Sequence, residues 1–161
     1  MTIIKHKPAT KASASGHDAI AMLKADHAAV ERLFADYGKA STVSSKQALV
    51  AALCKALSVH AQLEEEIFYP AVKAALKDKL LVPEATVEHA GVENLLAQLQ
   101  GQTPNGELYD AKVKVLSEYV KHHIKEEQSE MFAKAAAAKL DLAELGTRMA
   151  TRKAELLAAL A

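Results

Sequence analysis

Apolar side chains recur every three or four residues over five stretches of the chain, which is the spacing of one helical face. The first stretch begins near Asp18, a candidate N-cap, and ends at about Tyr37, before Gly38. Its apolar positions are Ile20, Leu23, Val30 and Phe34. His27 falls in the same stripe. The pattern therefore predicts a helix with a histidine on its buried face.

The second stretch predicts a helix that begins at Ser44 or Ser45 and reaches Pro70. Its apolar stripe includes His60 and Glu64, at positions where apolar residues are expected. Pro70 lacks an N–H and crowds the preceding turn, so it should kink or end this helix.

The region after His60 includes two further glutamates, a short helical segment and a third long helix. Glu65 and Glu66 lie off the second apolar stripe and are expected on a solvated face. Residues 71–82 are expected to form a short helical segment, either a bent continuation of the second helix or a separate one. A third long helix is predicted from about 84 to 100, with His89 in register with its apolar positions.

The turn sequence at 101–106 precedes a fourth predicted helix, which runs from Glu107 or Leu108 to about Ala137. The residues assigned to its inner face are Leu108, Val115, Tyr119, Met131 and either His122 or His123. A cap at Asp141 predicts a fifth helix at about 142–160. The apolar stripe of this last helix needs a partner, either the outside of the bundle or another subunit.

Long helices with short connections favour antiparallel neighbours, so we predict an all-α fold. The expected architecture is an up-down-up-down four-helix bundle with an additional C-terminal helix. A chain of 161 residues suits one such core. The predicted parts are a flexible N-terminal arm at 1–16, the bundle at 17–138 and the C-terminal helix at 139–161.

Charge and composition exclude several classes of partner. Lys and Arg together number 20, as do Asp and Glu, so neither nucleic acid nor acidic lipid is an expected partner. No apolar run is long enough for a transmembrane helix, and the N-terminus lacks the apolar centre of a secretory signal. Cys54 is the single cysteine, and we expect it to be buried. These features predict a cytoplasmic protein.

On each of four predicted helices a histidine precedes a glutamate by four residues, which places the two side chains one turn apart. The pairs are His27 with Glu31, His60 with Glu64, His89 with Glu93, and His123 with Glu127. One such pair is common on helix surfaces, but four on separate helices predict a metal site inside the bundle.

The predicted inward-facing set combines imidazole nitrogens with carboxylate oxygens. Its members are His27, His60, Glu64, His89, His123 and Glu127. Such donors suit iron or manganese, and six of them suit two ions bridged by the two carboxylates.

The ordered motifs resemble the hemerythrin-like HHE cation-binding domain over about residues 17–135. They are Asp26-His27, His60-x-x-x-Glu64 followed by Glu-Ile-Phe-Tyr-Pro70, Glu88-His89, and His122-His123-x-x-x-Glu127. The resemblance implies a non-heme centre of two Fe ions with oxo or hydroxo and carboxylate bridges. It also implies that the site deals with O2, peroxide or iron status. On this basis His27, His60, His89 and His123 are the nitrogen ligands, and Glu64 and Glu127 are the bridges.

Two positions depart from the oxygen-carrying members of that family. Those proteins have a second histidine four residues after the first on the third helix, where this chain has Glu93. They also have an aspartate at the position of Gln128, and Glu127 lies one residue earlier. A site with fewer histidines and more carboxylate stabilises the ferric state, so simple oxygen carriage is not expected.

Several assignments stay open at this level. Glu93 is either a further ligand or an exposed charge, and Glu31 is expected to be solvated. The family register favours His123 over His122, which has Glu126 one turn later. Tyr119 could line the site or pack at the helix edge. The expected core residues nearby are Phe68, Tyr69, Met131 and Phe132.

These features favour a protein that binds or reacts with O2, peroxide or another small diatomic ligand, or that senses iron or redox state. The alternative is a metal-responsive regulatory or iron-storage module without turnover. In that case the C-terminal helix would contact a partner protein or form a homodimer. A metal-free bundle would leave two core glutamates unexplained.

Overall fold

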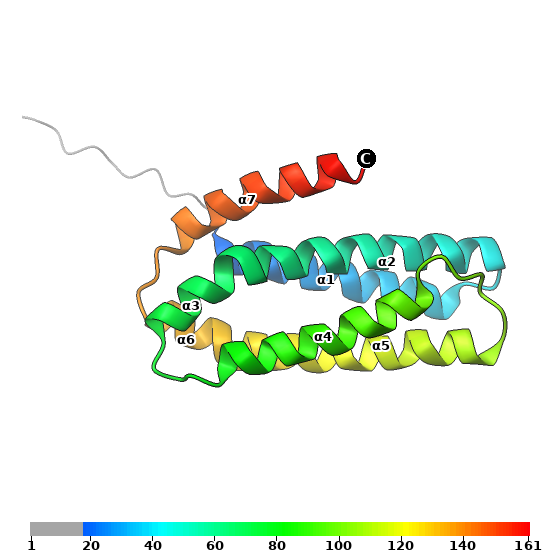
Figure 1. Cartoon of the computed structure of the whole chain (residues 1–161), viewed down its shortest axis with the longest axis horizontal. Helices are drawn as coiled ribbons and strands as arrows, with labels where there is room; N and C mark the ends of the chain where they lie inside the picture. Colours follow the sequence, from blue (N-terminus) through cyan, green and yellow to red (C-terminus); the bar gives the residue numbers. More distant parts are fainter. Residues whose placement is uncertain (1–17) are drawn as a thin grey trace, which may run out of the picture.

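The computed structural model describes residues 18–161, and this range contains helices and no strand. The predicted arm at 1–16 lies outside the described residues. Four rods pack as the predicted up-down-up-down bundle, with a fifth helix alongside (Figure 1). The rods are α1 (Ala19–Lys39), α2 (Val43–Leu63) continued by η1 (Glu64–Phe68) and α3 (Tyr69–Ala75), α4 (Leu81–Leu99), and α5 (Glu107–Glu126) continued by η2 (Glu127–Met131) and α6 (Phe132–Ala137). The fifth helix is α7 (Leu142–Ala159).

Side-chain caps fix where three helices begin. Asp18 caps α1 and Asp141 caps α7, as predicted, because each carboxylate accepts a backbone N–H three residues on, at 2.8 and 3.0 Å. The predicted cap of α2 was wrong by a few residues. Thr42 caps it, in place of Ser44 or Ser45, since the Thr42 hydroxyl accepts the Ser45 N–H at 3.1 Å.

The second and fourth rods each contain one π turn, and each π turn begins at a glutamate of the predicted ligand set. The Tyr69 N–H donates to the Glu64 carbonyl, and the Phe132 N–H donates to the Glu127 carbonyl, in both cases five residues back. The predicted change of direction at Pro70 follows the first of these turns. There the rod bends and continues as α3 (Figure 1), which ends at Ala75.

Buried apolar side chains form two clusters along the bundle. The first cluster includes Leu23, Leu63, Phe68, Val72, Met131, Phe132, Leu145 and Met149. The second cluster includes Val30, Phe34, Leu53, Leu57, Leu96, Val113, Leu116 and Val120. Along α1 and the fourth rod, buried histidines and a glutamate lie between residues of one cluster and residues of the other.

The predicted inner face of the fourth helix was correct for His123 and Met131, which are buried, but out of register in the first part of the helix. Leu108 and Tyr119 are 69% and 50% exposed, because the buried positions of α5 are offset from them by one residue. Those buried positions are Tyr109, Val113, Leu116 and Val120. The aromatic ring of Tyr119 lies against Gly91 on the outside of the bundle.

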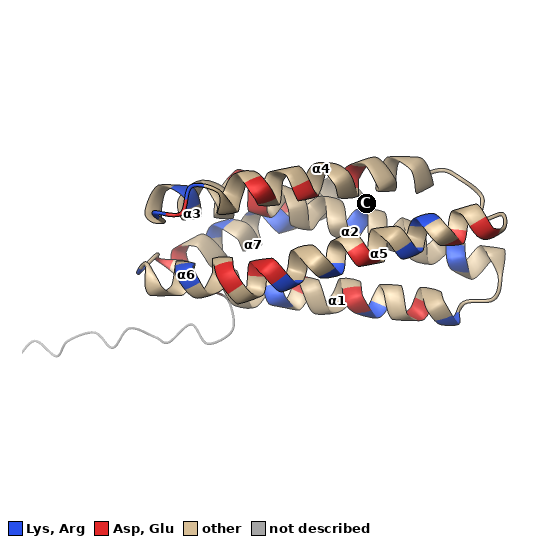
Figure 2. Ribbon diagram, turned by 90° about the horizontal axis from the view of Figure 1, so that it is seen from below, with Lys and Arg blue, Asp and Glu red and all other residues tan. Residues whose placement is uncertain are grey.

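The fifth helix packs on the bundle. Leu145 and Met149 are buried in the first cluster, where α7 crosses α1 and α2. Acidic and basic residues are interspersed over the helices (Figure 2). None of the helices in the described part of the chain is long and apolar enough to cross a membrane.

Candidate metal centre

Six ionisable side chains are buried in the layer between the two apolar clusters, and each is at most 7% exposed. They are the predicted set His27, His60, Glu64, His89, His123 and Glu127. All four rods contribute to this layer, since α1 and α4 each supply one histidine and the other two rods each supply a histidine and a glutamate. The structure therefore brings together every residue of the predicted set.

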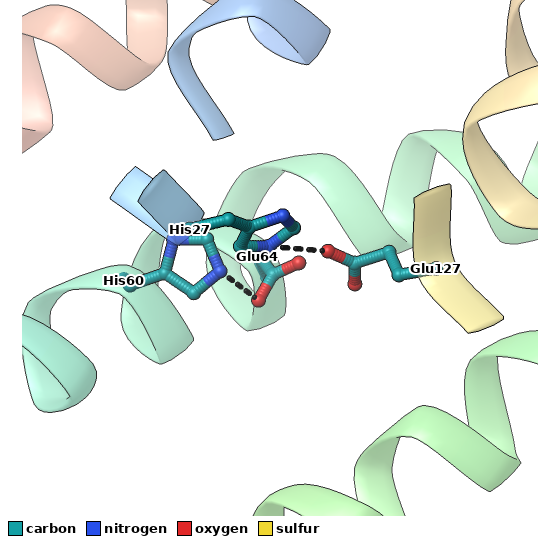
Figure 3. Close-up of side chains that lie close together, drawn as sticks. All are labelled: His27, His60, Glu64 and Glu127. Atoms are coloured by element: carbon teal, nitrogen blue, oxygen red, sulfur yellow. Dashed lines mark ion pairs between the residues drawn. The ribbon is translucent and has the colours of Figure 1, made fainter. Parts of the chain in front are cut away.

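The first group of donor atoms comprises His27, His60, Glu64 and Glu127, whose ligand atoms lie within 4.8 Å of one another. Nε2 of His60 is 2.9 Å from Oε1 of Glu64, and Nε2 of His27 is 3.1 Å from Oε1 of Glu127. Figure 3 shows the two rings and the two carboxylates turned toward one another.

The second group shares Glu64 with the first and adds His89 and His123. Nε2 of His89 is 3.4 Å from Oε1 of Glu64, and Nε2 of His123 is 3.3 Å from Oε2 of Glu127. Each carboxylate thus lies between one histidine of each group, which is the position of a bridging ligand.

Several atoms of this layer fit a cation better than they fit one another. Nε2 of His27 and His60, both oxygens of Glu64 and Oε1 of Glu127 are buried without a hydrogen-bond partner among residues 18–161. The short contacts of His27 with Glu127 and of His60 with Glu64 lack the angles of a hydrogen bond. Buried polar atoms left unpaired are costly, and two buried carboxylates are more so. A metal ion would satisfy all of them, so the donor set fits a metal site.

A second layer of polar groups contacts Nδ1 of each of the four histidines in the predicted set. The four Nδ1 contacts are His27 to Gln128 at 2.9 Å, His60 to Asp26 at 3.1 Å, His89 to Glu65 at 2.9 Å and His123 to Glu88 at 3.0 Å. With Nδ1 engaged, each ring presents Nε2 to the centre, as metal-ligating histidines do.

Comparison with known proteins decides the family. The sequence model of the Hemerythrin HHE cation binding domain matches residues 18–135. The chain belongs to this family. The resemblance seen in the motifs is thereby confirmed.

Two relatives place this HHE domain more closely. A crystal structure of a Hemerythrin HHE cation binding domain-containing protein from Mycobacterium kansasii matches with a TM-score of 0.77, 26% identity and 88% coverage of both chains. A DNA nickase from Nostoc sp. is 27% identical over 112 residues, which are 70% of this chain. The match covers 32% of the nickase, so the chain spans about a third of the length of that relative.

Tyr69 is a site residue of this HHE domain that the sequence did not reveal. Its hydroxyl donates to Oε2 of Glu127 at 2.6 Å and lies 3.2 Å from Nε2 of His89 and 3.4 Å from Nε2 of His123. Glu64 and Tyr69 would point about 140° apart on an uninterrupted α-helix. The π turn between them turns both toward the centre, where the Tyr69 oxygen could also reach an ion.

The metal-free centre holds protons as well as charges. Burial lowers the pKa of His60 and His123, but the adjacent carboxylates outweigh burial and raise these pKa values to about 10 and about 9. Burial raises the pKa of Glu127, but contacts with Glu64, His123 and His27 hold it well below its usual range. Burial and the two glutamates raise the pKa of Tyr69 well above its usual value. Protonated imidazoles therefore balance the carboxylates in the absence of metal.

An apolar cavity of about 40 Å³ adjoins the centre, and all four histidines line it. Its other walls are largely aliphatic and include Val30, Leu57, Val92, Leu96, Val120 and Ile124. This volume holds one or two water-sized molecules. A small apolar gas molecule or a peroxide fits such a space.

Burial distinguishes the candidate residues that the sequence left open. His123 and Glu127 are buried, whereas the His122 side chain is 63% exposed and lies 3.3 Å from Glu126 at the surface. Glu93 is exposed and lines the cavity without joining either donor group.

Two other expectations are settled in the same way. Glu31 is exposed, as expected. Glu65 is also exposed, as expected, but its carboxylate contacts Nδ1 of His89 at 2.9 Å.

Proposed function

We propose that the chain binds two iron ions in this layer and that the site binds or reacts with O2 or peroxide. His27 and His60 would hold one ion, His89 and His123 the other, and Glu64 and Glu127 would bridge them. The observation that carries the proposal is the convergence of four Nε2 atoms on two buried carboxylates beside an apolar cavity.

Iron would supply redox chemistry and an open coordination position, while the chain supplies the surroundings. The four histidine rings are fixed by the partners of their Nδ1 atoms, which are Gln128, Asp26, Glu65 and Glu88. The aliphatic wall of the cavity keeps bulk water away. The Tyr69 hydroxyl is a buried donor that faces the second ion position.

The donor set favours iron or manganese over metals that prefer thiolates, and it favours reaction over carriage. Nitrogen and oxygen donors suit Fe and Mn, and thiolates, which favour Zn or Cu(I), are lacking in both donor groups. Two shared carboxylates stabilise the ferric state. We therefore expect turnover of an oxygen species, or an irreversible response to one, in preference to reversible O2 release.

The first test is metal analysis of the purified chain after loading with ferrous iron without oxygen. About two irons per chain are expected, with near-ultraviolet charge-transfer bands that appear in air or with peroxide and disappear on reduction. H60A should lose the iron held by His27 and His60 and keep at most about one iron per chain, with weaker bands, while E93Q, which changes a cavity residue outside both donor groups, should keep both ions. Iron content well below one per chain in the wild type would overturn the proposal.

A metal-responsive module without turnover is the second candidate. It is favoured by the contact between Lys153 of α7 and Asp26, the residue that contacts Nδ1 of His60. Iron-loaded protein that consumes no peroxide, but changes its partner contacts with iron, would select it. DNA nicking is not part of either proposal, because the match covers a third of the nickase and the charges of this chain balance.

A further inference from the structure

The fifth helix, α7, lies outside the family match, which ends at residue 135. It is nevertheless connected to the candidate metal centre through one carboxylate, that of Asp26. Lys153 Nζ donates to Oδ1 of Asp26 at 2.6 Å. The other oxygen of Asp26, Oδ2, lies 3.1 Å from Nδ1 of His60. A continuous chain of contacts thus runs from α7 through α1 to a predicted ligand on α2.

This chain of contacts is partly shielded from water. The side chains of Lys153, Asp26 and His60 are 34%, 15% and 7% exposed, so shielding increases toward the centre. A charge placed on Asp26 is therefore felt at His60 more strongly than a charge on an exposed pair would be.

Among the four groups that hold the histidines, Asp26 has a distinct environment. Within residues 18–161, it is the one whose carboxylate is paired with a lysine or arginine. Glu65 contacts His89 alone, Glu88 contacts histidines, and Gln128 is neutral. A carboxylate on Nδ1 makes an imidazole a stronger electron donor to its metal, and a cation on that carboxylate weakens this effect.

We propose that Lys153 is a positioning residue through which docking of α7 tunes the iron held by His60. This inference rests on the proposed two-iron site. Lys153 fixes the Asp26 carboxylate and reduces its electron donation to His60, so a docked α7 raises the reduction potential of that ion. Because such coupling is reciprocal, oxidation or reduction of the ion also changes how firmly α7 docks.

The neighbouring residue provides a matched control. Arg152 donates to Glu66 at 2.7 and 3.2 Å, which is a second ion pair between α7 and the rest of the bundle. Glu66 contacts none of the predicted ligands in the described part of the chain. Loss of this pair weakens docking of α7 but leaves the partner of His60 unchanged.

The experiment is a redox titration of the iron-loaded full chain, followed by its near-ultraviolet bands, with iron content measured for every variant. K153M should titrate at a lower potential than the wild type, K153R should restore most of the difference, and R152M should match the wild type. K153Q serves as a second neutral variant should K153M fold poorly, and circular dichroism checks the fold of each.

Two results would overturn the inference. Equal shifts in K153M and R152M would mean that α7 acts only by packing, and unshifted potentials in both would mean that Asp26 does not transmit the charge. Either result in an iron-loaded chain leaves the proposed function intact. A wild-type chain that takes up no iron would overturn the proposed function and this inference together.

Discussion

The half of the centre built by α1 and the second rod closely repeats the half built by α4 and the fourth rod. The His27 and His60 rings are 4.8 Å apart at 62°, and the His89 and His123 rings are 4.8 Å apart at 63°. In each half, the residue before one histidine holds the other, and a glutamate begins a π turn. One backbone solution thus appears twice around the same centre.

The two halves differ in the side chains that surround this shared frame. Tyr69 after the first π turn corresponds to Phe132 after the second, and Phe132 stacks on His27 at 5.8 Å. Glu65 after the first bridging glutamate corresponds to Gln128 after the second. Asp26 is paired with Lys153, whereas its counterpart in the other half, Glu88, is paired with His122.

These differences make the surroundings of the two proposed ion positions unequal. The His89 and His123 position is surrounded by a phenol and by two carboxylates that have no lysine or arginine partner within residues 18–161. The His27 and His60 position has an amide, a lysine-paired carboxylate and a phenyl ring. We expect the former ion to favour the ferric state more strongly.

Removal of the shared carboxylate should have the largest effect, since it breaks both halves. E64L should abolish binding of both ions and with it the metal-linked stabilisation, which is about 4 kcal/mol at a thousandfold excess over Kd. Without metal, E64L should also be less stable than the wild type, because it removes the carboxylate that faces His60 and leaves this buried histidine without its ion-pair partner. Thermal unfolding with and without iron measures both effects, and unchanged iron content in E64L would contradict the bridging role.

Removal of one histidine should separate the halves. H27A and H89A should each retain about one iron per chain, in different positions. The iron that H89A retains should be reduced at a higher potential than the iron that H27A retains. Equal potentials in the two variants would mean that the ions are equivalent, and loss of both ions from either variant would mean that neither half binds alone.

The pH dependence of the metal-free chain should be smaller and should come from both halves. The pKa values of His60 and His123 are raised to about 10 and about 9, above the unfolded value. Their stabilising charge is fully present below pH 6.5 and is lost as the pH rises through these values. The free energy of unfolding should therefore fall between about pH 6.5 and 10.

Urea unfolding of metal-free protein at several pH values measures this fall. H60Q should remove the part of this fall that extends to the highest pH, because the pKa of His60 is higher than that of His123. Iron affinity should change in the opposite direction, since the metal and the protons compete for the same nitrogens. A free energy of unfolding that rises over this range would contradict the charge balance derived for the centre.

The sequence sufficed for the fold and for the residues that gather in the layer, because helical spacing is local information. A histidine and a glutamate four residues apart share a face wherever the helix is regular, so His60 and Glu64 could be placed without the structure. Their role as ligands stays a prediction. Ordered motifs also separated His123 from His122, which burial now distinguishes.

What the sequence could not provide depends on departures from that regular spacing and on partners from distant helices. Tyr69 reaches the centre because a π turn intervenes, and ideal periodicity turns it away. Glu65 lies off the apolar stripe, yet the position of α4 makes it the partner of His89. Tyr119 was a candidate for the site because one residue of register on α5 is too little for periodicity to resolve.

The smallest predicted effect comes from a change at Glu65, the partner of His89. E65Q gives this histidine an amide partner, as Gln128 is for His27. E65Q should weaken one iron by about 10- to 100-fold and leave the other unchanged, since an amide supports the donor strength of His89 less than a carboxylate does. A binding titration should then show the affinity of one step reduced by this factor and the affinity of the other step unchanged.

E66Q is the matched control for E65Q, because Glu66 is adjacent and exposed but pairs with Arg152 on α7. It should leave both steps in place. Q128E tests the reverse change, which should strengthen the iron held by His27 and lower its reduction potential. If E65Q and E66Q gave the same titration, the contact between Glu65 and His89 would carry no weight in metal binding. The inequality of the two ions would then have to arise from Tyr69 and Lys153 alone.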